Sequence, residues 1–207
     1  MQSTFKVMEN KEALNTLNEI KDLMERSSRF KAVSGWSIVI IGILASLASA
    51  VIYYFFNEMI LNTPLKLKIA LVVAVCLFVV SFLTVLLMSR RKALKNGIRF
   101  KWDATVKQLV LNFTLPLIAG GVFCIALIMQ GYYGLTSSVM LLFYGMALLC
   151  SQKYTYSSLR FLAYAELLLG LIDCFVVDYA LLIWFVGFGI LHIVYGIVFI
   201  IRHKGEK

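Results

Sequence analysis

Charged residues are scarce in this sequence. Asp, Glu, Lys and Arg make up 15% of the 207 residues, and apolar residues make up 61%. A typical soluble domain is about a quarter charged and about half apolar. A soluble fold of this composition would have too few polar side chains to cover its surface, so the composition predicts a protein whose solvent is the lipid bilayer.

Motifs for catalysis, cofactor binding and metal binding are also absent. The sequence has no GxSxG, HExxH or Walker motif, and the four cysteines form no CxxC pair. Only one of the two histidines, His192, lies in an apolar segment, which excludes a bis-histidine haem within one chain. We therefore expect no enzyme activity, no cofactor and no metal site.

The basic residues produce a formal net charge of +9 but form no nucleic-acid-binding module. They cluster beside apolar segments, where Lys and Arg set the orientation of membrane proteins. Nucleic acid is therefore not an expected partner.

Six apolar segments approach or exceed the roughly 20 residues that a membrane-spanning helix needs. The fifth is the weakest, because it contains Arg160, Glu166 and Asp173. The predicted fold class is all-α, a polytopic bundle of six transmembrane helices within residues 32–201, after a cytoplasmic amphipathic helix at 1–31 and before a tail at 202–207. The spans are expected at about 32–56, 69–88, 110–129, 132–150, 159–177 and 179–201.

The basic residues between these spans alternate from one side of the membrane to the other. Nearly all of them fall before the first span, between the second and third, between the fourth and fifth, or after the sixth. Only Lys66 and Lys68 fall in a connection on the opposite side. Because positive residues stay in the cytoplasm, we expect a bacterial inner-membrane protein with both termini cytoplasmic.

Two cytoplasmic segments are candidates for contacts with partners. Residues 5–30 place their apolar side chains on one face of a predicted helix, which needs an apolar partner. That partner is the membrane surface, the protein's own cytoplasmic connection, a second copy in a homo-oligomer, or a cytoplasmic protein. The second segment is basic and is expected to contact anionic lipids through Arg90, Arg91, Lys92 and Lys95.

Glu166 and His192 are ionisable residues within predicted spans, where such a group costs about 2.5 to 3.5 kcal/mol on insertion scales. At 1.5 Å per residue, the two residues lie at nearly the same depth, roughly 12 to 15 Å from the cytoplasmic boundary. We predict that they form an intramembrane polar pair. Three roles remain open: an interhelical hydrogen bond, a proton-responsive switch, or one element of a substrate pathway.

Small residues indicate how the helices pack. Gly170 shares a helix face with Glu166, and Gly189 and Gly196 share one with His192, so we expect these two faces to pack together. Gly42 and Ser46 belong to a similar face on the first span. Arg160 and Asp173 lie near opposite ends of the fifth span, where each is either a structural residue or part of a pathway.

Two stretches carry a resemblance to a known group of proteins. Residues 24–30, MERSSRF, lead into Ser34 and Gly35, and residues 187–196, GFGILHIVYG, lie in the last span. These stretches resemble a family of uncharacterised six-span bacterial inner-membrane proteins. The glycine-rich hairpins are also similar in composition to the acid-resistance family of six-span membrane proteins. The resemblance implies a six-span fold and brings no established activity.

The sequence therefore predicts a non-enzymatic integral membrane protein with a regulatory, stress-related or assembly role. The alternative is a small proton-linked transporter or channel that uses Glu166 and His192. A dry, closed bundle would favour the first function, and an aqueous pathway reaching those side chains would favour the second.

Overall fold

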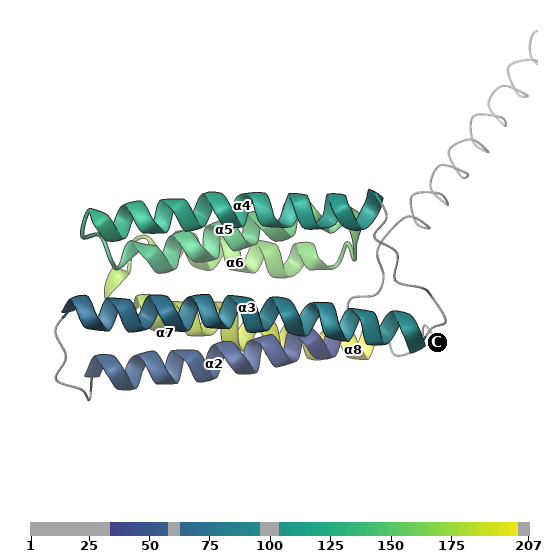
Figure 1. Cartoon of the computed structure of the whole chain (residues 1–207), viewed down its shortest axis with the longest axis horizontal. Coiled ribbons are helices and arrows are strands. Elements are labelled where there is room, and N and C mark those ends of the chain that lie inside the picture. Colours follow the sequence, from purple (N-terminus) through teal and green to yellow (C-terminus); the bar gives the residue numbers. More distant parts are fainter. Residues whose placement is uncertain (1–33, 58–62, 96–103, 203–207) are drawn as a thin grey trace, which may run out of the picture.

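The computed structural model describes residues 34–57, 63–95 and 104–202. Every regular element within these ranges is a helix, which confirms the predicted all-α class for this part of the chain. The helix predicted at 1–31 and residues 203–207 of the predicted tail lie outside the described residues. The main helices are α2 (Gly35–Asn57), α3 (Thr63–Lys95), α4 (Ala104–Met129), α5 (Leu135–Ser151), α6 (Leu159–Asp173), α7 (Ala180–Trp184), η3 (Phe185–Leu191) and α8 (His192–Arg202) (Figure 1).

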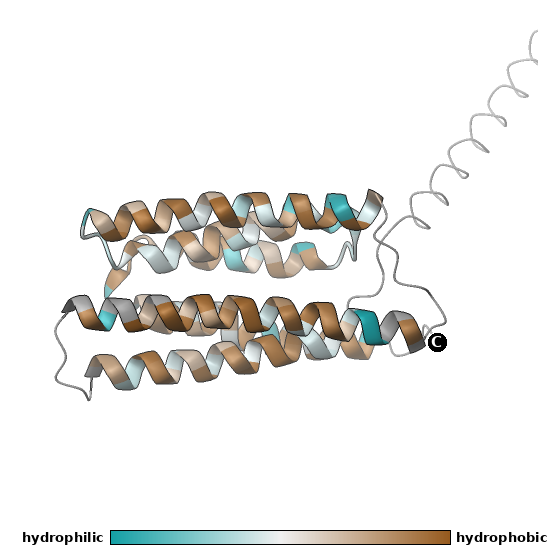
Figure 2. Cartoon of the chain, in the orientation of Figure 1, coloured by the Kyte–Doolittle hydropathy of each residue, from teal (hydrophilic) through white to brown (hydrophobic). Residues whose placement is uncertain are grey.

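The outward faces of the helices are apolar. Figure 2 shows hydrophobic residues along most of each helix, with hydrophilic residues gathered mainly near the helix ends. Large apolar side chains such as Leu115 and Phe175 are 64% and 88% exposed. Such surfaces are stable in lipid and not in water. Five helical segments are long and apolar enough to cross a membrane, as expected of a multi-pass membrane protein: Gly35–Phe56, Val72–Arg91, Ala104–Met129, Leu135–Tyr154 and Val177–Arg202.

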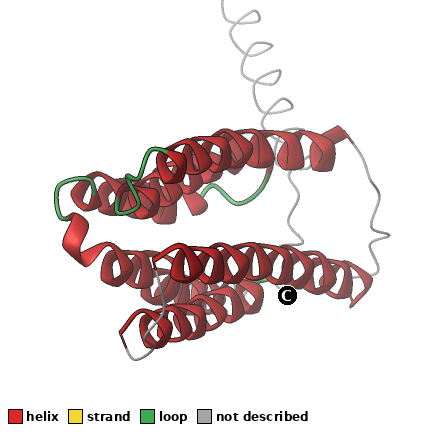
Figure 3. Ribbon diagram, turned by 60° about the vertical axis from the view of Figure 1, so that its left-hand side comes forward, coloured by secondary structure: helices red, strands yellow, loops and turns green. Residues whose placement is uncertain are grey.

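The helices form two layers, which Figures 1 and 3 show from different sides. One layer contains α4, α5 and α6, with α5 packed against both neighbours. The other contains α2, α3 and a continuous helical segment made of α7, η3 and α8, with α2 packed against both neighbours. Short 3-10 helices, η1 (Gln152–Tyr154) and η2 (Val177–Tyr179), lie in the connections on either side of α6.

Helix α6 is the element on which the span count depends. It has 15 residues, so it is roughly 22 Å long, shorter than the roughly 30 Å hydrocarbon core. By length and composition, α6 is therefore not among the five segments that could span a membrane.

The segment predicted as the second span, 69–88, lies within a longer helix. Helix α3 begins before residue 69 and continues past residue 88 to Lys95, giving 33 residues. Arg90, Arg91, Lys92 and Lys95 consequently belong to the last turns of this helix. Lys, Arg, Leu and Ala all favour helix, which explains why the helix continues beyond the apolar segment.

Candidate functional site

A cluster of buried polar side chains lies between the two layers. Glu166, on α6, has no exposed surface, and His192, the first residue of α8, is 1% exposed. The imidazole Nδ1 of His192 lies 3.4 Å from Oε1 of Glu166. The structure therefore brings together the two residues whose depth in the membrane was predicted to match.

Tyr144 is the third member of this cluster, and sequence reasoning missed it. Its hydroxyl, carried by α5, lies 2.8 Å from Nε2 of His192, while Nδ1 of His192 lies 3.1 Å from the carbonyl oxygen of Gly187. Because a carbonyl only accepts, Nδ1 of the neutral imidazole carries the hydrogen and donates it. Nε2 then accepts the hydrogen of the Tyr144 hydroxyl. We call Glu166, His192 and Tyr144 the triad.

The carboxyl group of Glu166 has no hydrogen-bond partner for either oxygen. An isolated ionised carboxylate is costly in apolar surroundings, and the nearest group that can compensate its charge is His192. Neutralising this charge takes one proton, which is held either by the carboxyl group beside a neutral imidazole or by Nε2 of an imidazolium beside the carboxylate. In the second form Nε2 donates to the Tyr144 oxygen, which accepts after its hydroxyl rotates.

A π-helix shapes the backbone beside the triad. Element η3 is π-helical over Phe185–Leu191, and such segments are frequent at functional sites. A Cβ atom at Gly187 would lie 2.8 Å from Oε2 of Glu166 and 2.5 Å from Cδ2 of Leu141. Only glycine leaves room for the carboxyl group here. The sequence carries no signal for this role, because a spacing of five residues does not place Gly187 and His192 on one face of an ideal α-helix.

Aromatic rings surround the imidazole. The centroid of the Phe188 ring lies 5.9 Å from that of His192 and 5.1 Å from that of Tyr144, and Trp184 packs on Phe188 at 5.1 Å. The Phe113 ring meets Tyr144 edge-on at 6.0 Å. These contacts restrict the orientation of the imidazole and the phenol.

Asp173 belongs to a second buried polar cluster, two helical turns from Glu166 along α6. Its side chain has no exposed surface, and its Oδ2 accepts hydrogen bonds from the hydroxyls of Ser137 and, at 3.0 Å, Ser138. Ser137 Oγ also lies 3.1 Å from the carbonyl oxygen of Ala180. Arg160, in contrast, is exposed and lies over the neighbouring Phe161 ring, away from both clusters.

The predicted packing of the Gly170 face against the Gly189 and Gly196 face is wrong. A Cβ at Gly170 would meet Leu142 of α5, at 2.8 Å from its Cγ, and not the last span. Gly189 and Gly196 instead face α2. A Cβ at Gly189 would lie 2.7 Å from Ser46 Oγ, and one at Gly42 would lie 2.8 Å from the Gly189 carbonyl oxygen. Glu166 thus reaches His192 past Gly187.

Among residues 34–57, 63–95 and 104–202, no group of three His, Cys, Asp or Glu side chains gathers as a metal ion would require. No family model matches the sequence, and no curated protein or solved structure shows significant similarity to it. The resemblance to six-span inner-membrane proteins therefore stays a prediction.

Proposed function

We propose that this chain is a non-enzymatic, six-span regulatory protein of the bacterial inner membrane. In this proposal, the triad gains or loses a proton, and the change in charge alters how the two helix layers pack. The burial of Glu166 and His192 and the arrangement of α6 support this proposal.

The arrangement of α6 supports the sixth span. It lies beside α5 in the same layer and connects the η1 end of that layer to the η2 end (Figure 1). With α6 as a span, the basic connections fall on one side of the membrane, so both termini are cytoplasmic. Helix α6 is short for the hydrocarbon core, a mismatch that local thinning of the bilayer accommodates.

One observation carries the proton-responsive role: Glu166 is fully buried 3.4 Å from His192, and neither of its carboxyl oxygens has a hydrogen-bond partner. A buried carboxyl group that served only to stabilise helix packing would have hydrogen-bond partners for its oxygens. The other titratable groups near the pair are Tyr144 on α5, Tyr195 one turn along α8, and Asp173 two turns along α6. A change in the protonation of the pair therefore directly changes the electrostatic interactions among α5, α6 and α8.

The closed state of the bundle favours regulation over an open pathway. Glu166 and Asp173 have no exposed surface and His192 has almost none, so in this structure water does not touch these side chains. A protein that responds to protons without conducting them needs a buried site of this kind, which opens only as its helices move.

Spectroscopy on the purified, reconstituted protein tests proton binding. Infrared difference spectra recorded between about pH 5 and 8, where histidine titrates, will contain a carboxyl band from Glu166. The band will be lost in Glu166→Gln and kept in Asp173→Asn, which is the matched control. A carboxyl band unchanged by Glu166→Gln would show that the pair exchanges no proton over this range.

A distance measurement tests the regulatory step. Spin labels at Leu168 on α6 and Ile43 on α2 occupy exposed positions in opposite layers. Their distance distribution will change with pH in the otherwise unmodified protein and will be insensitive to pH in Glu166→Gln. Equal pH responses in the two proteins would contradict regulation through the triad.

A proton-linked transporter is the second candidate, and one observation favours it. Polar groups follow one another between the layers, from the Tyr195–Ser158 hydrogen bond through the triad to Asp173. Proteoliposomes with an internal pH dye and an imposed proton gradient distinguish the two functions. Proton entry that Glu166→Gln abolishes would establish transport, and the absence of proton entry would leave regulation as the function.

A further inference from the structure

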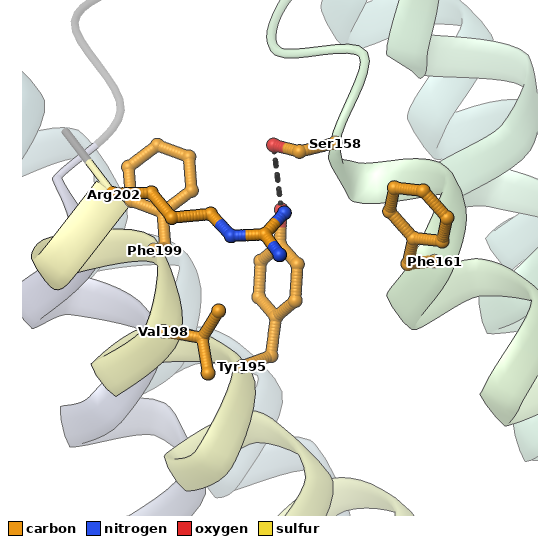
Figure 4. Close-up of a pocket in the computed structure, with 6 residues that line it drawn as sticks. All are labelled: Ser158, Phe161, Tyr195, Val198, Phe199 and Arg202. Atoms are coloured by element: carbon orange, nitrogen blue, oxygen red, sulfur yellow. Dashed lines mark hydrogen bonds between the residues drawn. The ribbon is translucent and has the colours of Figure 1, made fainter.

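A pocket separate from the triad lies at the end of the bundle where α6 begins and α8 ends. It has a volume of about 200 Å³ and is lined by Ser158, Phe161, Tyr195, Val198, Phe199 and Arg202. Figure 4 shows α6 on one side and α8 on the other, with the Arg202 guanidinium beside the hydrogen bond that joins Tyr195 to Ser158. We call this the Arg202 pocket.

The polar side of this pocket is suited to an anion. Arg202 is exposed and forms no ion pair with any acidic residue of the described chain. The Tyr195 hydroxyl donates to Ser158 Oγ over 3.0 Å, which leaves the hydrogen of the Ser158 hydroxyl free to donate to a ligand. The backbone N–H groups of residues 159–161 are already bonded to carbonyls of residues 156–158. The guanidinium and the serine hydroxyl are therefore the donors that a ligand would meet.

Two of the apolar walls of the pocket face outward from the bundle. Phe161 is 56% exposed and Val198 is 41% exposed, on helices whose outer faces are apolar. Drug-sized ligands occupy pockets of about 300 Å³ or more, so this smaller volume fits a compact polar group whose apolar remainder stays outside. An occupant that matches both sides has an anionic head and a hydrocarbon tail.

We propose that the Arg202 pocket binds the phosphate of an anionic phospholipid, with an acyl chain lying along the outer faces of α6 and α8. Arg pairs with phosphate through two parallel hydrogen bonds, and basic pockets between spanning helices are known headgroup sites. A long cationic side chain at a helix end extends to the level of the headgroups, which places this guanidinium where lipid phosphates lie. The site requires only a bilayer around the bundle, so it can exist whether or not the function proposed for the triad is correct.

Native mass spectrometry of the full chain in detergent measures this directly, with phosphatidylglycerol and phosphatidylcholine as probes. The unmodified protein will retain one phosphatidylglycerol per chain with an apparent affinity about tenfold above that for phosphatidylcholine. Arg202→Gln will remove this preference, and Tyr195→Phe, which disrupts the hydroxyl pair, will weaken phosphatidylglycerol binding about fivefold. Because Arg202 is exposed, its replacement leaves the core intact, and gel filtration confirms folding.

Lys153→Gln is the control, since Lys153 is an exposed basic residue of η1 that does not line the pocket. It will leave phosphatidylglycerol binding unchanged. An equal loss in Lys153→Gln and Arg202→Gln would assign binding to general surface charge and overturn the proposal. Displacement of the lipid by an equal concentration of inorganic phosphate would identify a soluble anion as the ligand, which also overturns it.

Discussion

Replacement of Gly187 by alanine tests the geometry of the triad with the smallest available change. The added Cβ would lie 2.8 Å from Oε2 of Glu166 and 2.5 Å from Cδ2 of Leu141, closer than carbon atoms approach in packed proteins. Leu141 is itself fully buried, so it cannot turn outward to make room. The methyl group must therefore displace the Glu166 carboxyl, the leucine, or both.

The size of the effect follows from two opposing contributions. Overpacking a well-packed core costs about 1 to 3 kcal/mol. Alanine in place of glycine inside a helix gains up to about 1 kcal/mol. Gly121 supplies the control, because it lies inside α4 and a Cβ there would meet nothing within 4 Å. Gly121→Ala receives only the gain, so the two variants will differ in unfolding free energy by the overpacking cost of about 1 to 3 kcal/mol.

Unfolding by sodium dodecyl sulfate in mixed micelles, followed by circular dichroism, gives both free energies of unfolding. We expect Gly187→Ala to be less stable than the unmodified protein and Gly121→Ala to be as stable or more stable. Equal stability of the two alanine variants would mean that the Glu166 carboxyl does not lie against Gly187. The geometry of the triad would then be refuted, together with the function proposed from it.

Three further changes are measured by the same unfolding assay. Tyr144→Phe removes the hydroxyl from Nε2 of His192 and will lower the unfolding free energy by about 1 kcal/mol; no loss would contradict that hydrogen bond. Asp173→Ala will cost about 1 to 3 kcal/mol more than Asp173→Asn, which keeps an acceptor oxygen, and equal costs would contradict acceptance from the serines. Gly42→Leu will cost at least about 1 kcal/mol, because its Cβ would lie 2.8 Å from the Gly189 carbonyl oxygen; a neutral effect would show that α2 and η3 are not in close contact.

The sequence predicts the helices well, because the length of an apolar segment is a direct physical requirement. The predicted segment 132–150 corresponds to α5 at Leu135–Ser151, and the fifth and sixth segments correspond to α6 and to α7–η3–α8. The predicted shared depth of Glu166 and His192 rests on antiparallel helices in a bilayer of fixed thickness. Depth along a helix is therefore available from the sequence alone.

The sequence does not show in the same way which neighbouring helix each helix face packs against. In a bilayer both the lipid-facing and the protein-facing sides are apolar, so Gly189 and Gly196 carry no sign that they face α2 and not α6. Tyr144 in an apolar segment looks the same whether it lies at the membrane surface or inside the bundle. The π-helix adds a further difficulty. Gly187 and His192 would be about 140° apart on an ideal α-helix, yet they bond to each other here.

The triad and the Arg202 pocket lie in the same interface between the two helix layers. Within the described residues, four polar contacts join the layers: Ser137 to the Ala180 carbonyl, Tyr144 to His192, Glu166 to His192, and Tyr195 to Ser158. All of them reach the α7–η3–α8 segment. The triad occupies the middle of this interface, and the Arg202 pocket occupies one end of it.

Two ligands that bias the same packing equilibrium must each change the other's affinity by the same factor. If protonation of the triad moves α8 relative to α6, it moves Tyr195 and Arg202 relative to Ser158. We therefore expect the affinity for phosphatidylglycerol to differ about fivefold or more between about pH 5 and 8, and to lose this dependence in Glu166→Gln. Native mass spectrometry at the two pH values measures it. Helix α8 carries both His192 and Arg202, so a rigid α8 that moves at His192 must also move at Arg202. An affinity independent of pH would therefore show that α8 does not transmit the protonation state of the triad to the pocket.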